Sequence, residues 1–236
     1  MDRKPLIQTK LLSKHYQMGE VEVKALNKVD LQIYSGEFVV IVGPSGSGKS
    51  TLLNMIGGMD LPSEGDVYFK EECITHYSDK QLTEYRRHKI GFVFQFYNLM
   101  ANLTARENIE LATEITTDAL EIDSIIENLG LSERKSHFPS QMSGGEQQRV
   151  AIARAIAKNP EVILCDEPTG ALDFETGISI LSVLKKINKE YGKTVIVITH
   201  NAGISKMANR VIKMRSGKII KDEYNPSPIA PERIEW

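Results

Sequence analysis

A glycine-rich loop carries the most recognisable chemistry of this sequence. The segment GPSGSGKS, Gly43 to Ser50, follows the apolar run FVVIV and precedes a helix-forming stretch. This spacing is that of a P-loop, in which backbone N–H groups and a helix N-terminus bind phosphate. A flexible loop with an incidental lysine is the alternative, but a lysine in a first helical turn opposes the helix dipole unless an anion lies there. We expect Lys49 to contact the β- and γ-phosphates and the Ser50 hydroxyl to ligate Mg²⁺. The nucleotide contacts predicted for this loop are Gly43, Pro44, Ser45, Gly46, Ser47, Gly48, Lys49, Ser50 and Thr51.

Two acids follow a second apolar run, in VILCDEP. Four apolar residues predict a buried strand, and ligand sites of α/β proteins form at the carboxyl ends of such strands. We expect Asp166 to hold the Mg²⁺ shell and Glu167 to polarise the water that attacks the γ-phosphate. Alone, the pair is equally compatible with exposed acids at the end of an ordinary strand; the phosphate loop favours the catalytic interpretation.

A second pair of glycines lies in MSGGEQQRVAIARA. Ser143 and Glu146 fit a capping box for a helix start. Gly144 and Gly145 between them each cost about 1 kcal/mol relative to alanine in a helix. We therefore predict that a ligand approaches this backbone closely; a capped helix with two functionless glycines is the alternative.

The elements that must position these residues alternate between strands and helices. Apolar runs predict strands at 38–43, 90–95, 162–167 and 194–200, and the N-terminal stretch to residue 34 is expected to form further strands. Helices are expected at 49–58, 78–88, 144–158 and 174–191, with a hairpin turning at 216–217. This order predicts an α/β fold with a mostly parallel sheet. The strand-free stretch 104–141 predicts a helical subdomain inserted at about 96–158, and the Pro-rich tail 226–236 is expected to be loosely ordered.

Composition excludes several classes of protein. The chain has 236 residues, 41% of them hydrophobic, and a formal net charge of −2, which gives no support for nucleic acid as a partner. The first ten residues contain no apolar signal region, and no apolar run is long enough to span a bilayer. The two cysteines, Cys73 and Cys165, have no metal-binding or redox spacing, which suits a reducing cytoplasm.

The motifs together resemble the nucleotide-binding subunit of ATP-binding-cassette (ABC) systems, over nearly the whole chain. GPSGSGKS matches Walker A, VILCDEP matches Walker B, and MSGGEQQ matches the family signature LSGGQ. The resemblance implies a P-loop NTPase core with an N-terminal antiparallel β subdomain, ATP and Mg²⁺ as ligands, and one ATPase domain over residues 1–225. The other matching positions are an adenine-stacking aromatic at Tyr16, the Q-loop glutamine Gln95, the D-loop aspartate Asp173 and the switch histidine His200.

The resemblance also implies a dimer of two identical chains. In this family two subunits enclose two ATP molecules head to tail, so Ser143, Gly144 and Gly145 are expected to bind the γ-phosphate held by the opposite copy. Glycine permits close backbone approach, and the helix dipole attracts an anion. Asp173 is expected to be both the N-cap of its helix and a contact across the dimer.

The remaining assignments compete with structural roles. His200 is expected to hydrogen-bond the γ-phosphate, the alternative being a strand-end histidine with other partners. Tyr16 is expected to contact adenine, or else to pack in the core. Gln95 is assigned to metal or water contact and to sensing a membrane partner. Met142 and Glu146 replace the usual leucine and glutamine, and Glu146 adds a negative charge near the triphosphate.

Transport by such a chain would need separate integral membrane permease subunits. An apolar patch after Gln95 is expected to contact them, with core packing as an equal alternative; it comprises Phe96, Tyr97, Leu99 and Met100. The chain would then lie on the inner face of the plasma membrane. It most resembles the macrolide-exporter and lipoprotein-releasing group, and a regulator of cell-wall hydrolases is a related alternative. A soluble DNA-repair ATPase would need a long coiled coil, and an ABC translation factor two cassettes; neither is present.

Overall fold

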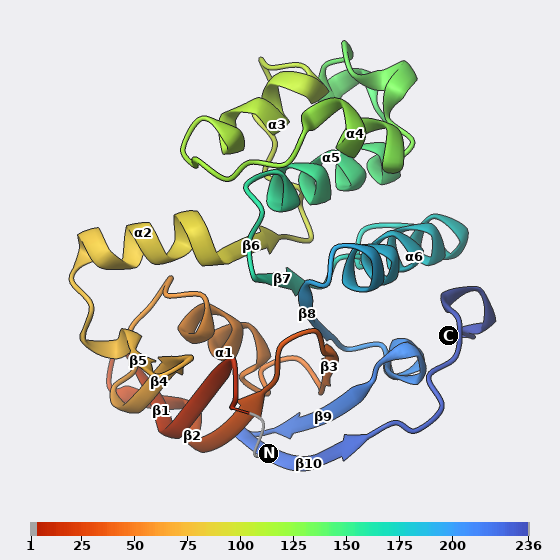
Figure 1. Cartoon of the computed structure of the whole chain (residues 1–236). Coiled ribbons are helices and arrows are strands. Elements are labelled where there is room, and N and C mark those ends of the chain that lie inside the picture. Colours follow the sequence, from red (N-terminus) through yellow and green to blue (C-terminus); the bar gives the residue numbers. More distant parts are fainter. Residues whose placement is uncertain (1–3, 236) are drawn as a thin grey trace.

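The computed structural model describes residues 4–235, so the first three residues and Trp236 of the tail lie outside the described part. Two sheets form the framework (Figure 1). The larger has the strand order β10-β9-β3-β8-β7-β6 and the smaller the order β2-β1-β4-β5. The strands of the larger sheet are β3 (Phe38–Val42), β6 (Ile90–Val93), β7 (Val162–Asp166), β8 (Thr194–Thr199), β9 (Arg210–Arg215) and β10 (Lys218–Tyr224).

The larger sheet is parallel except at β10, which pairs antiparallel with β9. Strand β3 is buried along its whole length because both faces of the sheet are covered. Phe38 and Val40 pack in one apolar cluster with helices α5 (Gly144–Ala157) and α6 (Phe174–Glu190). Val39 and Ile41 pack on the opposite face with α1 (Lys49–Ile56) and the smaller sheet. The predicted mostly parallel sheet is confirmed.

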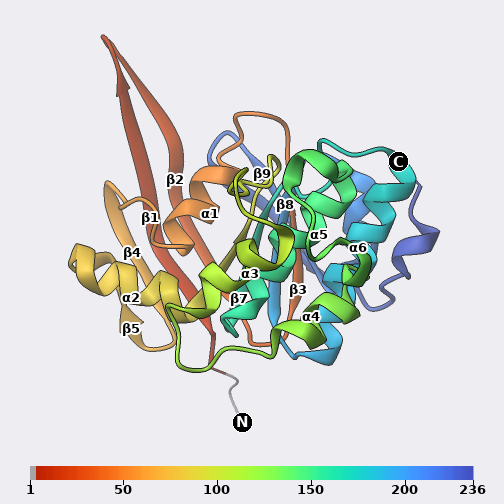
Figure 2. The same ribbon diagram turned by 90° about the horizontal axis from the view of Figure 1, so that it is seen from above.

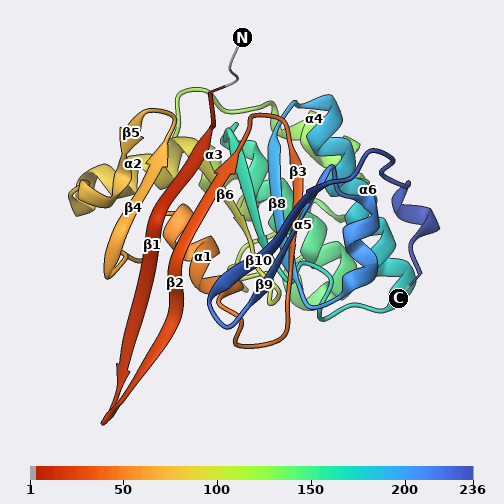
Figure 3. The same ribbon diagram turned by 90° about the horizontal axis from the view of Figure 1, so that it is seen from below.

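The smaller sheet is antiparallel, as the resemblance implied. It contains β1 (Ile7–Met18), β2 (Val21–Ile33), β4 (Glu64–Phe69) and the short β5 (Glu72–Cys73). The long β1–β2 hairpin extends beyond the body of the molecule (Figures 2 and 3). A 3₁₀ turn, η1 (Ile74–His76), then leads to helix α2 (Asp79–Lys89) and back into the larger sheet at β6.

Helices alone fill the chain between β6 and β7, as predicted. They are α3 (Ala105–Thr113), α4 (Ile122–Asn128), the 3₁₀ turns η2 (Ser132–Arg134) and η3 (Pro139–Gln141), and α5. They lie together at one end of the molecule (Figure 1). The capping box predicted at Ser143 is formed, and capping boxes also start α2 at Ser78 and α3 at Thr104.

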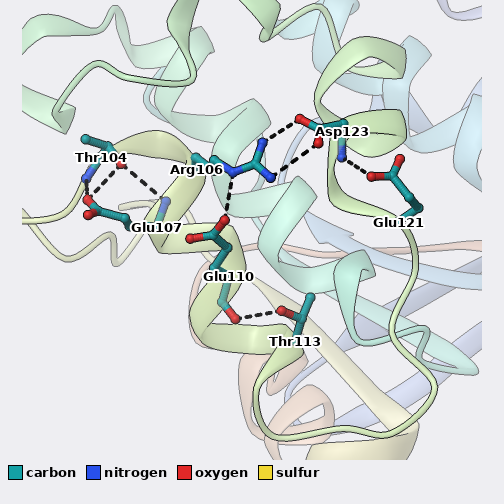
Figure 4. A network of polar contacts seen from close by, with 7 residues as sticks. All are labelled: Thr104, Arg106, Glu107, Glu110, Thr113, Glu121 and Asp123. Carbon is teal, nitrogen blue, oxygen red and sulfur yellow. Dashed lines mark hydrogen bonds and ion pairs between the residues drawn. The ribbon is translucent and has the colours of Figure 1, made fainter.

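One ionic group joins α3 to α4 (Figure 4). The Arg106 guanidinium donates to Glu110 Oε1 at 2.7 Å and makes two bonds to the Asp123 carboxylate. Glu121 caps α4 by accepting from the backbone N–H of Asp123 at 2.9 Å. The two helices therefore share polar contacts as well as the apolar core beneath them.

The C-terminal tail differs from the expectation of loose order. The 3₁₀ turn η4 (Ala202–Met207) follows β8, and a second one, η5 (Pro231–Arg233), lies within the tail. Directly after η5, the Ile234 side chain is only 2% exposed and belongs to the apolar cluster that includes α6. The Ser182 hydroxyl also donates to Glu232 at 2.7 Å. One buried isoleucine and a few hydrogen bonds to distant residues hold the tail against α6. The proline-rich composition of the tail could not predict these contacts. Among the described residues, no helix combines the length and the apolarity needed to cross a membrane.

Candidate active site

The phosphate loop lies between β3 and α1, as predicted, and its backbone depends on two glycines. Gly48, the N-cap of α1, has φ +96°, and a Cβ there would lie 2.3 Å from the Ala25 carbonyl oxygen of β2. Gly46 has φ +73° and nothing within 4 Å of its would-be Cβ, so the loop is open on that side. A side chain at either position would strain the backbone.

Lys49 and Ser50 start helix α1 beside this loop. The Lys49 side chain is buried, and its ammonium donates to the carbonyl oxygens of Gly43 at 2.7 Å and Pro44 at 3.1 Å. The Ser50 hydroxyl donates to Asp166 Oδ1 at 3.4 Å, so the hydroxyl and the carboxylate predicted to hold one ion are adjacent. A buried ammonium at the positive end of a helix favours an anionic ligand.

Glu167, which follows β7, contacts His200, which follows β8. His200 Nδ1 lies 3.0 Å from Glu167 Oε1, an arrangement that the sequence did not predict. Glu167 has φ +47°, which is strained for a residue with a side chain and is typical of functional positions. Burial, and secondarily the neighbouring Glu167 charge, raise the pKa of Asp166, while Ser50 and Lys49 act against them. A bound cation would relieve the same electrostatic penalty.

These groups line one cleft of about 680 Å³. Gln95, at the end of β6, lines it as predicted, together with Asp166, Glu167 and His200. The rest of the lining is Ser45, Gly46, Ser47, Gly48, Lys49, Ser50, Thr51, Phe94, Phe96 and Asn98. The structure therefore brings together the predicted metal and catalytic residues and the phosphate-loop residues from Ser45 to Thr51. Gly43 and Pro44 are not among the residues that line the cleft, and their carbonyl oxygens instead accept from Lys49.

The signature residues do not line this cleft. Ser143 caps α5 with its side chain exposed to solvent, and its hydroxyl accepts from the backbone N–H of Glu146 at 3.3 Å. Both glycines also have packing roles. A Cβ on Gly144 would lie 2.7 Å from the Tyr97 hydroxyl, and one on Gly145 would lie 2.3 Å from Thr176 Cγ2 on α6.

The charge of Glu146 is paired within the chain. Arg134, from η2, donates to Glu146 Oε1 at 2.7 Å, and the Ser143 backbone N–H donates to Glu146 Oε2 at 2.7 Å. Arg134 first, and then Ser143, lower the pKa of Glu146 to about 2. The departure from the usual glutamine is thus accompanied by a cation that compensates it.

Two further predicted residues lie outside the cleft. Asp173 is the N-cap of α6, because its carboxylate accepts from the Thr176 N–H at 3.0 Å, and this part of its predicted role is confirmed. The Tyr16 hydroxyl donates to Asp60 at 2.9 Å, and the Lys14 ammonium lies 5.0 Å from the centroid of the Tyr16 ring. Its contact with adenine stays a prediction.

Sequence reasoning missed two side chains that hold the loops of the cleft. Gln148 on α5 is fully buried and donates to the carbonyl oxygens of Phe94 at 3.4 Å and Pro168 at 2.8 Å. Arg154, two turns later, donates to the carbonyls of Tyr97 at 2.9 Å and Asn98 at 2.6 Å. Gln148 and Arg154 lie about 240° apart around α5, so no single polar stripe in the sequence marked them.

Comparison with known proteins decides the family. The ABC transporter family model matches residues 26–170, more than half of the chain. The chain belongs to the ABC transporter family. As an ABC protein it is an ATP-binding chain and an ATPase, and the order of its motifs agrees with this assignment.

Relatives of this ABC protein differ in length. The ABC transporter ATP-binding protein MJ0796 of Methanocaldococcus jannaschii is 49% identical, with 92% of this chain and 97% of that protein covered. The macrolide export ATP-binding/permease protein MacB of Azoarcus sp. is 43% identical over 97% of this chain, which spans only 35% of that protein.

Solved structures confirm the fold of the cassette. A dimeric post-hydrolysis state of MJ0796 bound to ADP and Pi has a TM-score of 0.84 and 45% identity, covering 92% of this chain and 98% of that one. A second dimeric MJ0796 structure has a TM-score of 0.85 and 46% identity, with the same coverage.

Proposed function

We propose that this chain powers a separate membrane permease by ATP-driven closure of a homodimer. The observation that carries the proposal is the division of the site: the phosphate loop, Asp166 and Glu167 line one cleft, whereas Ser143 is exposed on α5 outside it. A second copy, placed head to tail, would supply its Ser143 region to this cleft. The dimeric MJ0796 structures support the proposal, because this chain covers 98% of them at 45–46% identity.

The residues present fit a Mg²⁺ ion. Ser50 and Asp166 offer a hydroxyl and a carboxylate 3.4 Å apart, and Gln95 adds an amide oxygen in the same cleft. These are hard oxygen ligands of the kind Mg²⁺ prefers. When bound, the ion would neutralise charge on the phosphates.

Glu167 and His200 are proposed to act as a pair. A His200 imidazolium, protonated at both nitrogens, would donate from Nδ1 to Glu167, which orients the carboxylate, and from Nε2 to the γ-phosphate. Glu167 would accept a proton from the attacking water, and Lys49 would stabilise the charge on the phosphates. We further propose that residues 1–225 form one ATPase domain with the helical subdomain at about 96–158, and that Tyr16 contacts adenine.

The permease would contact the segment after Gln95. Phe96 is 75% exposed and Met100 51% exposed, whereas Leu99 packs against the apolar cluster and is partly buried. This places an apolar surface between the nucleotide cleft and the helical subdomain, so a partner there would respond to ATP. An export or force-transmitting role at the inner face of the plasma membrane fits the similarity to MacB.

The dimer is tested with Glu167→Gln, which keeps the shape of the side chain and removes the proton acceptor. On gel filtration with MgATP this variant should elute as a dimer, and without nucleotide it should elute later as a monomer. Ser143→Arg in the same chain should abolish the ATP-dependent dimer while leaving ATP binding to the monomer intact. A Glu167→Gln chain that binds ATP and remains monomeric would refute completion of the site by a second copy.

The permease contact is tested by fractionation of host cells. Met100→Ser, at a position that does not line the nucleotide cleft, should reduce recovery of the chain with membranes while leaving its ATPase activity unchanged. Ile220→Ser is the control, because Ile220 is comparably exposed, at 61%, but lies on β10. Equal recovery of all three proteins would contradict this placement.

A further inference from the structure

A second group of metal-binding side chains lies on the smaller sheet, outside the nucleotide cleft. Along β4, Val67 and Phe69 are buried toward the core, so Asp66 and Tyr68 project from the opposite face. Cys73 on β5 is opposite Tyr68 in the register. The turn η1 then brings His76 to the same place, because the Thr75 hydroxyl accepts from the Val67 backbone N–H at 2.8 Å.

The sequence pattern concealed this group. The expectation of no metal-binding pattern rested on the spacing between Cys73 and Cys165, and Cys165 is fully buried in β7. Pairing of β4 with β5 instead adds Asp66 to the short pattern Cys73-Ile74-Thr75-His76. One carboxylate, one thiol and one imidazole therefore converge from three consecutive elements.

The two distances from Asp66 to the other ligand atoms are close to those of a tetrahedral site. Asp66 Oδ1 lies 3.5 Å from Cys73 Sγ and 3.6 Å from His76 Nε2, and all three ligand atoms lie within 4.8 Å of one another. Zinc bonds of about 2.3 Å to sulfur and about 2.0–2.1 Å to nitrogen and oxygen give tetrahedral edges of about 3.3–3.5 Å. Little movement would be needed to place an ion between them.

We propose that Asp66, Cys73 and His76 bind a Zn²⁺ ion, with water as the fourth ligand. Thiolate and imidazole favour zinc over the oxygen-preferring Mg²⁺ of the nucleotide cleft. His76 is exposed and the other two residues are half-buried, so an ion can enter from solvent. Lys10, opposite Asp66 in the register, holds its ammonium 4.7 Å from the Tyr68 ring centroid and, within residues 4–235, forms no ion pair with Asp66.

An ion here would fasten η1 to the edge of the sheet. The short strand β5 makes only two register pairs with β4, and the Thr75 bond to Val67 and the buried Ile74 side chain also hold this corner. His76 is followed by Tyr77 and by Ser78, the N-cap of α2. We therefore expect zinc to raise the melting temperature of the chain without requiring nucleotide.

The test is a Co²⁺ titration of the reduced, nucleotide-free, full-length chain. One equivalent should produce a sulfur-to-cobalt absorption band in the near ultraviolet, and Zn²⁺ should remove it by displacement. Cys73→Ser should abolish the band, and Asp66→Asn and His76→Ala should each weaken Co²⁺ binding at least about tenfold. His88→Ala is the matched control, since His88 lies on α2 and pairs with Glu84 instead.

The sulfur band distinguishes this site from metal bound in the nucleotide cleft. Asp166, Glu167 and His200 supply no thiol. Ellman's reagent gives a second readout: Cys73 should react in the native chain, and one equivalent of Zn²⁺ should slow that reaction at least tenfold. Absence of both the band and the protection in the folded wild-type chain would overturn the proposal. So would a band of equal strength in the Asp66 and His76 variants, because Cys73 would then bind alone.

Discussion

Replacement of Glu146 by glutamine separates the two roles of this residue at the start of α5. Glutamine still accepts the bond from the Ser143 backbone N–H, so the capping box is retained. The ion pair with Arg134, at 2.7 Å, is lost. Glutamine is also the usual residue of the family signature. The change therefore isolates the contribution of the Glu146–Arg134 ion pair, which this sequence has in addition.

The size of the effect follows from the pKa of Glu146. A fall from 4.5 to about 2 corresponds to about 3 kcal/mol of stabilisation, at about 1.4 kcal/mol per pH unit. Part of this belongs to the Ser143 bond, and the Arg134 side chain is 43% exposed, so solvent screening leaves about 1 kcal/mol for the pair. Because the folded pKa lies below the unfolded one, this stabilisation is complete above about pH 5 and disappears as the pH falls toward 2.

Urea unfolding at a series of pH values measures this directly. Glu146→Gln should lower the free energy of unfolding by about 1 kcal/mol at neutral pH, and its difference from wild type should shrink steadily below about pH 4.5. Arg134→Met should cost a similar amount, and the double variant should cost no more than either single one. A deficit that is the same at acidic and neutral pH would refute the electrostatic reasoning.

Two further variants probe the cleft. Lys49→Ala should abolish measurable ATP binding by isothermal calorimetry, because it removes the buried ammonium at the phosphate loop; unchanged affinity would contradict its role. Arg154→Met should lower the free energy of unfolding by about 2 kcal/mol, since it removes charged donors to two carbonyls. It should also expose the segment 96–100 to limited proteolysis, and a cleavage rate equal to wild type would show that Arg154 does not hold this loop.

Sequence cues identified elements whose determinants are local. The apolar runs of β3, β7 and β8 are long enough to mark buried strands, and the capping boxes at Ser78, Thr104 and Ser143 need only residues three positions apart. The phosphate loop and the two acids were predictable for the same reason, since each motif is continuous in the chain.

These local sequence patterns could not predict contacts between segments that are distant in the chain. Arg134 and Glu146 are 12 positions apart, and the chain between them passes through η3 before α5 begins. Asp66 lies close to Cys73 because β4 pairs with β5. Ile234 is buried because it packs against the apolar cluster that includes α6. In each case the two residues come together only when the chain has folded. The sequence between them carries no periodic pattern that predicts the contact.

The glycines of the signature have two sufficient explanations, and one variant pair separates them. A Cβ at Gly144 would lie 2.7 Å from the Tyr97 hydroxyl, so packing alone accounts for a glycine there. Tyr97→Phe removes that oxygen and leaves Leu172 Cδ2 at 3.2 Å from the added methyl, so Gly144→Ala should lose less stability in this background than in the wild-type chain, measured by thermal melting. If the proposed second copy delivers phosphate to this backbone, the added methyl should still impair ATP-dependent dimerisation and turnover. Recovery of both activities together with stability would assign Gly144 to packing alone and leave the exposed Ser143 to bind the opposite phosphate.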